Sequence, residues 1–344
     1  MRLVDFDLDP ALLQQFLEWP RQLYAGDPNW LDDPSAARLL SAGVYQGAIW
    51  RNFLVLDGSH VLGRLTASAN HLLTDDDGHP FGQLGFFECV DDPAAARLLV
   101  GAASEWLRLK IPQSRSVLAP MAFDTWHSYR LRTSGFDASS FQMEPYNPPH
   151  YPDLFASLGF AAVSHYVTKT VTDLPRLLRL WEPYHRRAVA RGYRFRTFNP
   201  ADSAGEMSLL YRLSTSIFKQ NPFYVDIPEA EFRCMYGGAA GQLDPDLLIF
   251  VTDPTGEPVG FSFSMPDPRQ PGTINVKTLG TLARVHGLGI GAALAHEIYR
   301  RFEARGFTRV NHCLMRAGNL ADLLDRHKAQ VTREYTLYSR ALTA

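Results

Sequence analysis

Runs of apolar residues, one of them alternating with polar residues at 161–171, predict strands in the first half of the chain. They lie at 53–58, 60–69, 82–90, 116–121 and 161–171. The first two form a pair around a turn at Asp57-Gly58. A helix is predicted at 93–110, because Asp92 and Pro93 supply the cap and the proline typical of a helix start. The stretch 126–152 is rich in Ser, Pro, Asn and Tyr, which predicts irregular backbone.

The second half repeats this order after a helical connector. Its predicted strands lie at 193–198, 247–253, 258–267, 273–282, 308–315 and 333–342. Its predicted helices lie at 203–220, 286–306 and 319–328. Each half therefore reads as strand, helix, strand pair, strand, helix, strand, helix, strand. The sequence predicts an α/β fold with a mixed sheet, an α+β unit used twice, with domains at 1–173 and 193–344 joined by the connector at 174–192.

Composition narrows the class of protein. The 344 residues are 46% hydrophobic, so the chain can bury a large core. Thirty-four basic and thirty-six acidic residues give a formal charge of −2, which disfavours binding to nucleic acid. The three scattered cysteines indicate a reducing compartment. The acidic start MRLVDFDLDP is unlike a signal peptide, and no run is long enough to cross a membrane, so we expect a soluble, cytoplasmic protein.

The sharpest chemical signal is a glycine-rich loop between a predicted strand and a predicted helix. It consists of His286, Gly287, Leu288, Gly289, Ile290, Gly291 and Ala292. Glycines at a helix start let an anion approach backbone N–H groups that have no partner in the helix, so a phosphate-bearing ligand is expected. Gly287, Gly289 and Ala292 also match GxGxxA, but the acidic residue that a dinucleotide site needs about 20 residues later is missing. The alternative interpretation of this loop is a strand-to-helix turn in which the glycines only relieve backbone strain and no ligand binds.

These residues resemble the acyl-CoA loop of the GCN5-related N-acetyltransferase (GNAT) family, in which Arg or Gln stands where this chain has His286. The resemblance implies that the amides from Gly287 to Ala292 hold the pyrophosphate of acetyl-CoA or another acyl-CoA. It also implies that the pantetheine arm pairs with the end of the preceding strand. That end maps onto Leu279, Thr281 and Leu282.

The family's later motif begins with Asn and has a Tyr seven residues on. Asn319 matches its opening, but Arg326 stands at the tyrosine position with His327 beside it. The family's tyrosine acid is therefore not carried over. The first half echoes the motif over residues 147–160 and has no glycine loop, so we expect its acyl-CoA site to be lost. The resemblance is thus to tandem members of the family.

Acyl transfer to an amine needs the neutral nucleophile. A lysine-like amine of pKa about 10.4 costs roughly 4.6 kcal/mol to deprotonate at pH 7, so a base or a water relay is useful. His312 is the leading catalytic candidate, because its strand borders the expected thioester, and His327 is the reserve. A hydrogen-bonded core histidine is the competing interpretation of His312. Cys313 should face the other side of that strand. No metal site is predicted.

The sequence therefore predicts an acyl-CoA-dependent N-acyltransferase, acting by acetyl transfer to the amine of a small molecule or amino-acid derivative. Two other functions stay open. One is a non-catalytic acyl-CoA-binding or sensor protein, which the missing tyrosine favours. The other is an aminoacyl-tRNA-dependent transferase, which the charge balance and the intact phosphate loop disfavour. The acceptor, the acyl chain and the oligomeric state are not indicated by the sequence.

Overall fold

The computed structural model describes residues 1–41, 48–237, 243–319 and 329–342, and the chain folds as two compact units. Unit 1 comprises Met1–His165, Pro222–Val225 and Glu334–Ala344, and unit 2 comprises Tyr166–Asn221 and Asp226–Arg333. Two long strands, β7 and β13, contribute residues to both units. The three-part division expected from the sequence stays a prediction.

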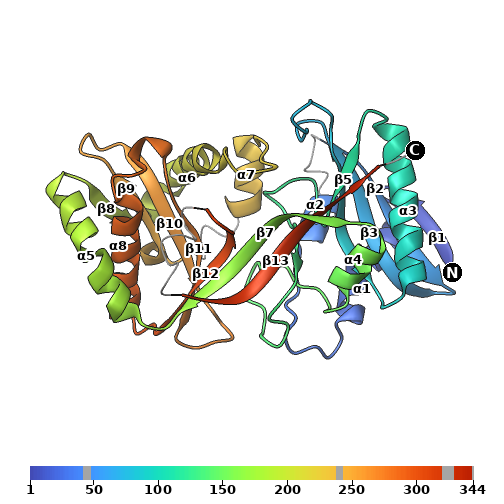
Figure 1. Cartoon of the computed structure of the whole chain (residues 1–344), viewed down its shortest axis with the longest axis horizontal. Coiled ribbons are helices and arrows are strands. Elements are labelled where there is room, and N and C mark those ends of the chain that lie inside the picture. Colours follow the sequence, from blue (N-terminus) through green and yellow to red (C-terminus); the bar gives the residue numbers. More distant parts are fainter. Residues whose placement is uncertain (42–47, 238–242, 320–328, 343–344) are drawn as a thin grey trace. The chain divides into compact units, whose positions relative to one another are not determined.

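Unit 1 is built from a sheet with helices on both faces (Figure 1). Its strands are β1 (Arg2–Phe6), β2 (Ala48–Asp57), β3 (His60–Asn70), β4 (Gly82–Cys89), β5 (Ser116–Ala119) and β6 (Leu131–Arg132), with the carboxyl part of β13 (Gln330–Ala341). Its helices are α1 (Pro10–Leu23), α2 (Ser35–Ser41), α3 (Pro93–Lys110) and α4 (Tyr151–Ser157). The sheet order is β1-β2-β3-β4-β5-β13, and β4 and β5 are parallel.

Successive side chains along β2 of unit 1 point to opposite faces of the sheet, and each face packs in a different hydrophobic core. Phe53 and Val55 of β2 pack in the core that contains α3 and α4. Leu54 and Leu56 of the same strand pack in the core that contains α1 and α2. Both faces of β2 are thus buried, which explains why its sequence is a continuous apolar run instead of a strict alternation.

Unit 2 repeats the plan. Its strands are the carboxyl part of β7 (Ala161–Val171), β8 (Arg194–Thr197), β9 (Leu248–Thr252), β10 (Pro258–Pro266), β11 (Thr273–Thr281) and β12 (Arg309–Arg316). Its helices are α5 (Leu174–Ala190), α6 (Ser203–Phe218), α7 (Glu229–Tyr236) and α8 (Ile290–Ala304), with 3-10 turns η1 (Pro200–Asp202), η3 (Pro245–Leu247) and η4 (Ala283–Val285). The order is β7-β12-β11-β10-β9-β8, with β11 and β12 parallel.

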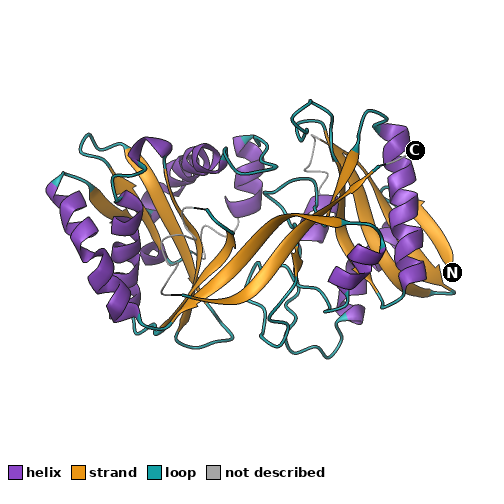
Figure 2. Cartoon of the chain, in the orientation of Figure 1, coloured by secondary structure: helices purple, strands orange, loops and turns teal. Residues whose placement is uncertain are grey.

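Helices cover both faces of the unit 2 sheet. Trp181 of α5 and Tyr299 of α8 meet edge to face, with ring centroids 5.1 Å apart, in a core shared with β9, β10 and β11. Ile217 of α6 lies over Gly280 of β11 on the other face. Figures 1 and 2 show α5 and α8 side by side along this sheet.

The predicted mixed α/β fold is confirmed, and so are the strands and helices expected from 53 to 121 and from 161 to 315. The helix predicted at 319–328 lies outside the described residues, apart from Asn319. The repeated order of elements placed a helix before the strand pair at 53–69, but no residue range was predicted for α1, α2 or α7. Helix α1 contains an internal proline, Pro20, and α2 and α7 have only seven and eight residues, too few to display a helical period.

Candidate functional site

The candidate site of unit 2 lies where two parallel strands part. β11 and β12 pair over four residues, from Thr273↔Arg309 to Val276↔His312. Beyond that point β11 continues to pair with β10 as far as Thr281, while β12 pairs with β7. The carboxyl half of β11 therefore has one edge that no described strand pairs with. Such an edge offers backbone donors and acceptors to an extended ligand.

A β-bulge marks the parting. Phe263 of β10 faces Thr278 and Ser264 faces Val276, so Lys277 of β11 is the extra residue. A bulge bends the strand and increases its twist, and bulges are frequent beside functional sites. The bulge thus assists the divergence of β11 from β12.

The glycine loop follows β11 through η4. Gly287 and Gly289 have φ of +78° and +81°, a backbone conformation that favours glycine. A Cβ atom at Gly289 would lie 2.6 Å from Cδ1 of Tyr184 on α5, so a side chain is excluded there on steric grounds as well. No atom lies within 4 Å of a Cβ placed at Gly287 or Gly291, so the approach at these two positions is open.

Helix α8 begins without a side-chain cap. Its first hydrogen bond runs from the Ala293 N–H to the Gly289 oxygen, 3.0 Å, and Gly289 as N-cap supplies no side-chain acceptor. The N–H groups of Ile290, Gly291 and Ala292 thus have no partner within the helix. Together with the positive end of the helix dipole, such N–H groups are the kind of arrangement that binds anions at helix starts.

The corresponding helix of unit 1, α3, is closed to an anion. Asp92 Oδ1 accepts hydrogen bonds from the N–H groups of Ala94 and Ala95, at 2.8 and 3.4 Å, and Pro93 contributes no N–H. A carboxylate thus already occupies the position that a phosphate would take.

The other residues that the resemblance implicates lie near the loop or at the end of β12. Leu279, Thr281 and Leu282 are partly buried at the end of β11. The Nε2 of His286 is 3.0 Å from the Thr281 oxygen, so this side chain ties the loop back to β11. The Asn319 N–H donates to the Arg316 oxygen, 3.2 Å, just after β12. The reserve catalytic residue His327 lies outside the described residues.

His312 lies inside unit 2. Its side chain is buried, and its Nε2 is 2.7 Å from the hydroxyl oxygen of Tyr299 on α8. This contact is one that a structural histidine would also make, so the role of His312 as a base stays a prediction. Cys313 lies on the opposite face of β12, with Sγ 3.8 Å from Oδ1 of Asn275, as alternation predicted.

A buried polar ladder beside the parting was missed by the sequence reasoning. Asn311 donates to Asn275 at 2.9 Å and accepts from the Thr170 hydroxyl at 2.8 Å, and the Thr170 and Thr332 hydroxyls are 3.1 Å apart. These side chains link β11, β12, β7 and the start of β13. Asparagine is uncommon inside strands, and two at matched strand positions were the available signal. The ladder fixes the register of the strands just before they diverge.

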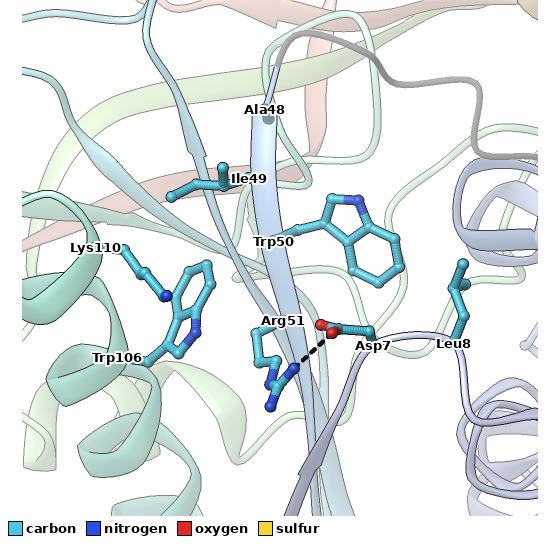
Figure 3. Close-up of a pocket in the computed structure, with 8 residues that line it drawn as sticks. All are labelled: Asp7, Leu8, Ala48, Ile49, Trp50, Arg51, Trp106 and Lys110. Atoms are coloured by element: carbon cyan, nitrogen blue, oxygen red, sulfur yellow. Dashed lines mark ion pairs between the residues drawn. The ribbon is translucent and has the colours of Figure 1, made fainter.

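A hollow of about 560 Å³ lies on unit 1 (Figure 3). Trp50 and Trp106 lie on either side of β2, and an ion pair of 2.7 Å joins Arg51 to Asp7. None of its lining residues belongs to the glycine loop or to a parting pair of parallel strands. We therefore place no chemistry in this hollow.

No protein-family model matches the chain. Protein YghO of Escherichia coli (strain K12) is 25% identical over 264 residues, which cover 74% of this chain and 66% of that protein. The bacterial ceramide synthase of Caulobacter vibrioides (strain NA1000 / CB15N) is 23% identical over 267 residues, covering 75% and 68%. The chain thus matches about two thirds of the length of each curated relative.

Solved structures resemble the chain over nearly its whole length. A tandem GNAT protein from the clavulanic acid biosynthesis pathway, solved without AcCoA, has a TM-score of 0.59 at 12% identity and covers 100% of this chain and 99% of its own. A GCN5-related N-acetyltransferase from Sphaerobacter thermophilus has a TM-score of 0.51 at 16% identity, covering 99% and 96%. Within the described residues, no helix combines the length and the apolar character needed to span a bilayer.

Proposed function

From the premise that this chain has the tandem fold of the GCN5-related N-acetyltransferases, we propose that it is an acyl-CoA-dependent N-acyltransferase whose donor binds to unit 2. The amine nitrogen of the acceptor attacks the thioester carbonyl. A C–N bond forms and the C–S bond breaks. The amine loses one proton, and the departing CoA thiolate takes one up.

The observation that carries this proposal is the uncapped start of α8 beside the parted strands. Three N–H groups without helical partners adjoin left-handed glycines, and β11, whose carboxyl half has an edge that no described strand pairs with, precedes them through η4. A pyrophosphate joined to an extended, amide-containing arm matches both features in that order. In unit 1 the same helix position holds Asp92, which supports one donor site in each chain.

The name of one curated relative supports the transfer of an acyl group to nitrogen. A ceramide is the amide of a long-chain amino alcohol, so the name of the Caulobacter relative describes a long-chain amide. The glycine loop by itself resembles one that binds acetyl-CoA. The name of the Caulobacter relative and the resemblance of the loop therefore suggest acyl chains of different length for the same donor site.

The decisive experiment measures binding and turnover separately. Calorimetry with CoA should give one site per chain. Mass spectrometry should then detect an amide when the chain is incubated with acetyl-CoA or palmitoyl-CoA and a panel of small and long-chain amines. Tight CoA binding without any amide would overturn the catalytic proposal in favour of a binding protein. Absence of CoA binding by folded protein would overturn the donor-site assignment itself.

A further inference from the structure

Unit 1 has a cavity at its own parting of parallel strands. β4 and β5 pair at Gly82↔Val117 and Gln83↔Leu118, and the Met121 N–H then donates to the Leu84 oxygen at 2.8 Å. Beyond this bond Phe86, with φ of +51°, forms a bulge. A cavity of about 510 Å³ begins here, a volume typical of small-molecule sites, and all of its lining residues belong to unit 1.

Glu88, at the end of the bulge, is one of the residues that line this cavity. Its Oε2 accepts hydrogen bonds from the hydroxyls of Tyr24, 2.6 Å, and Tyr151, 2.8 Å. No hydrogen bond from any described residue reaches Oε1. The two tyrosines fix the carboxylate in place and leave half of its accepting capacity for another donor.

Arg64, directly opposite Glu88 on β3, does not neutralise it by contact. Its guanidinium donates to the Phe16 oxygen at 2.6 Å and lies 4.7 Å from the centre of the Phe16 ring. Within the described chain, no ion pair of 4 Å or less joins Arg64 to Glu88. Burial raises the pKa of Glu88, and the field of Arg64 offsets part of that effect. A cation bound at Oε1 would stabilise the ionised carboxylate further.

The walls of the cavity suit an organic cation. Trp30, Phe86 and Tyr146 line it, and Tyr24 packs between Trp30 and Tyr146 with ring centroids 5.3 and 5.4 Å away. Aromatic faces attract cations. The lining also holds five carboxylates and three arginines, which leaves a formal charge of −2. The carboxylates are Glu18, Asp32, Asp33, Glu88 and Glu144.

We propose that this cavity binds a primary ammonium ion carried on an apolar chain, with the ammonium group on Glu88 Oε1 and the chain along Leu13 and Leu17 of α1. The negative lining disfavours a diphosphate, and the neighbouring start of α3 is closed by Asp92. The parting of strands in unit 1 thus serves a different ligand from the one proposed for unit 2. Neither proposal depends on the other.

The test uses n-octylammonium as the probe and calorimetry on the full chain at pH 7. One site per chain is expected, with much weaker binding of n-octanol, which has the same chain and no charge. Glu88→Gln should weaken octylammonium binding at least tenfold, because the amide keeps an acceptor for the tyrosines and loses the charge. Glu105→Gln, the same change at an exposed position of α3, should leave the affinity unchanged.

Trp30→Ala provides an independent variant if Glu88→Gln unfolds. It should weaken binding and abolish the change in tryptophan fluorescence that octylammonium causes in the parent. Equal affinity for octanol and octylammonium would overturn the proposal. Parental affinity in folded Glu88→Gln, or no binding to the parent chain, would also overturn it. CoA binding to unit 2 is measured separately, so the two proposals can fail independently.

Discussion

At the scale of single residues, the loop before α8 depends on glycine for two different reasons. Gly287 and Gly289 adopt left-handed backbone that disfavours other residues. Gly289 also lies against the Tyr184 ring, where a Cβ has no room. Gly291 has neither constraint, so the absence of its side chain serves only to leave open space above the first turn of the helix.

Replacing Gly289 with alanine should weaken CoA binding at least tenfold. The loop has to move to relieve both the left-handed strain and the contact with Tyr184, and the N–H groups of the helix start move with it. Calorimetry measures the change. Gly306→Ala is the matched control, because Gly306 has φ of +79° at the other end of α8 and no atom within 4 Å of its Cβ position. It should lose about 1–2 kcal/mol of stability and keep the parental affinity for CoA.

If His312 supplies the base, His312→Ala should lower turnover at least a hundredfold and leave CoA affinity nearly unchanged. The reason is that general acid–base assistance typically raises the rate about a hundred- to ten-thousandfold. Tyr299→Phe is the control, because it removes the hydrogen bond to His312 and keeps the imidazole. Parental turnover in the folded alanine variant would mean that His312 only packs between β12 and α8.

At the scale of elements, the packing of α5 on α8 brings together two histidines, of which His296 is buried and His185 is half-buried. His185 and His296 have ring centroids 4.7 Å apart, and His185 Nε2 is 3.5 Å from a carboxylate oxygen of Glu297. Burial lowers the pKa of both histidines, although Glu297 acts in the opposite direction. Burial would raise the pKa of Glu297, but Arg300 and Arg301 outweigh it, so its pKa is lowered. The interface therefore favours neutral imidazoles.

This interface should weaken in mild acid. Below about pH 6.5 the unfolded chain binds protons at both positions while the folded chain resists them, so the free energy of unfolding falls as pH decreases through that value. Above about pH 7.5 the two histidines should contribute no pH dependence. Chemical denaturation of the parent and of His185→Gln/His296→Gln between pH 5 and 8 measures the difference. Parallel pH profiles for the two proteins would contradict the prediction.

At the scale of the whole molecule, two units of one plan differ at corresponding positions. Each has a bulged strand at the parting of parallel strands and a helix after it, and of these two helices α3 has a side-chain cap while α8 has none. The repeated order of elements could be predicted from the sequence, and so could the loss of the glycine loop from unit 1. The cavity beside Glu88 could not, because Tyr24, Glu88 and Tyr151 are separated by more than 60 residues along the chain.

CoA should bind once per chain. Asp92→Ala should cost about 1 kcal/mol of stability through the lost cap, and it should not create a second site, because the glycines that let a diphosphate approach are absent from α3. Calorimetric stoichiometry with CoA, together with thermal unfolding, measures both effects. A stoichiometry of two, in either protein, would show that unit 1 retains a donor site.

The sequence by itself determined the elements and the loop, because both are local properties. The spacing of apolar residues selects strand or helix over a few neighbouring residues, and glycine at 287 and 289 permits the left-handed backbone that the loop adopts. Only the tertiary structure decided which side chains and strand edges of those elements come together. The parting of β11 from β12, the Tyr299 contact of His312, and the tyrosine contacts of Glu88 each depend on strands and helices distant in sequence. Such contacts arise only when the cores form, and no local pattern encodes which distant side chain will meet which.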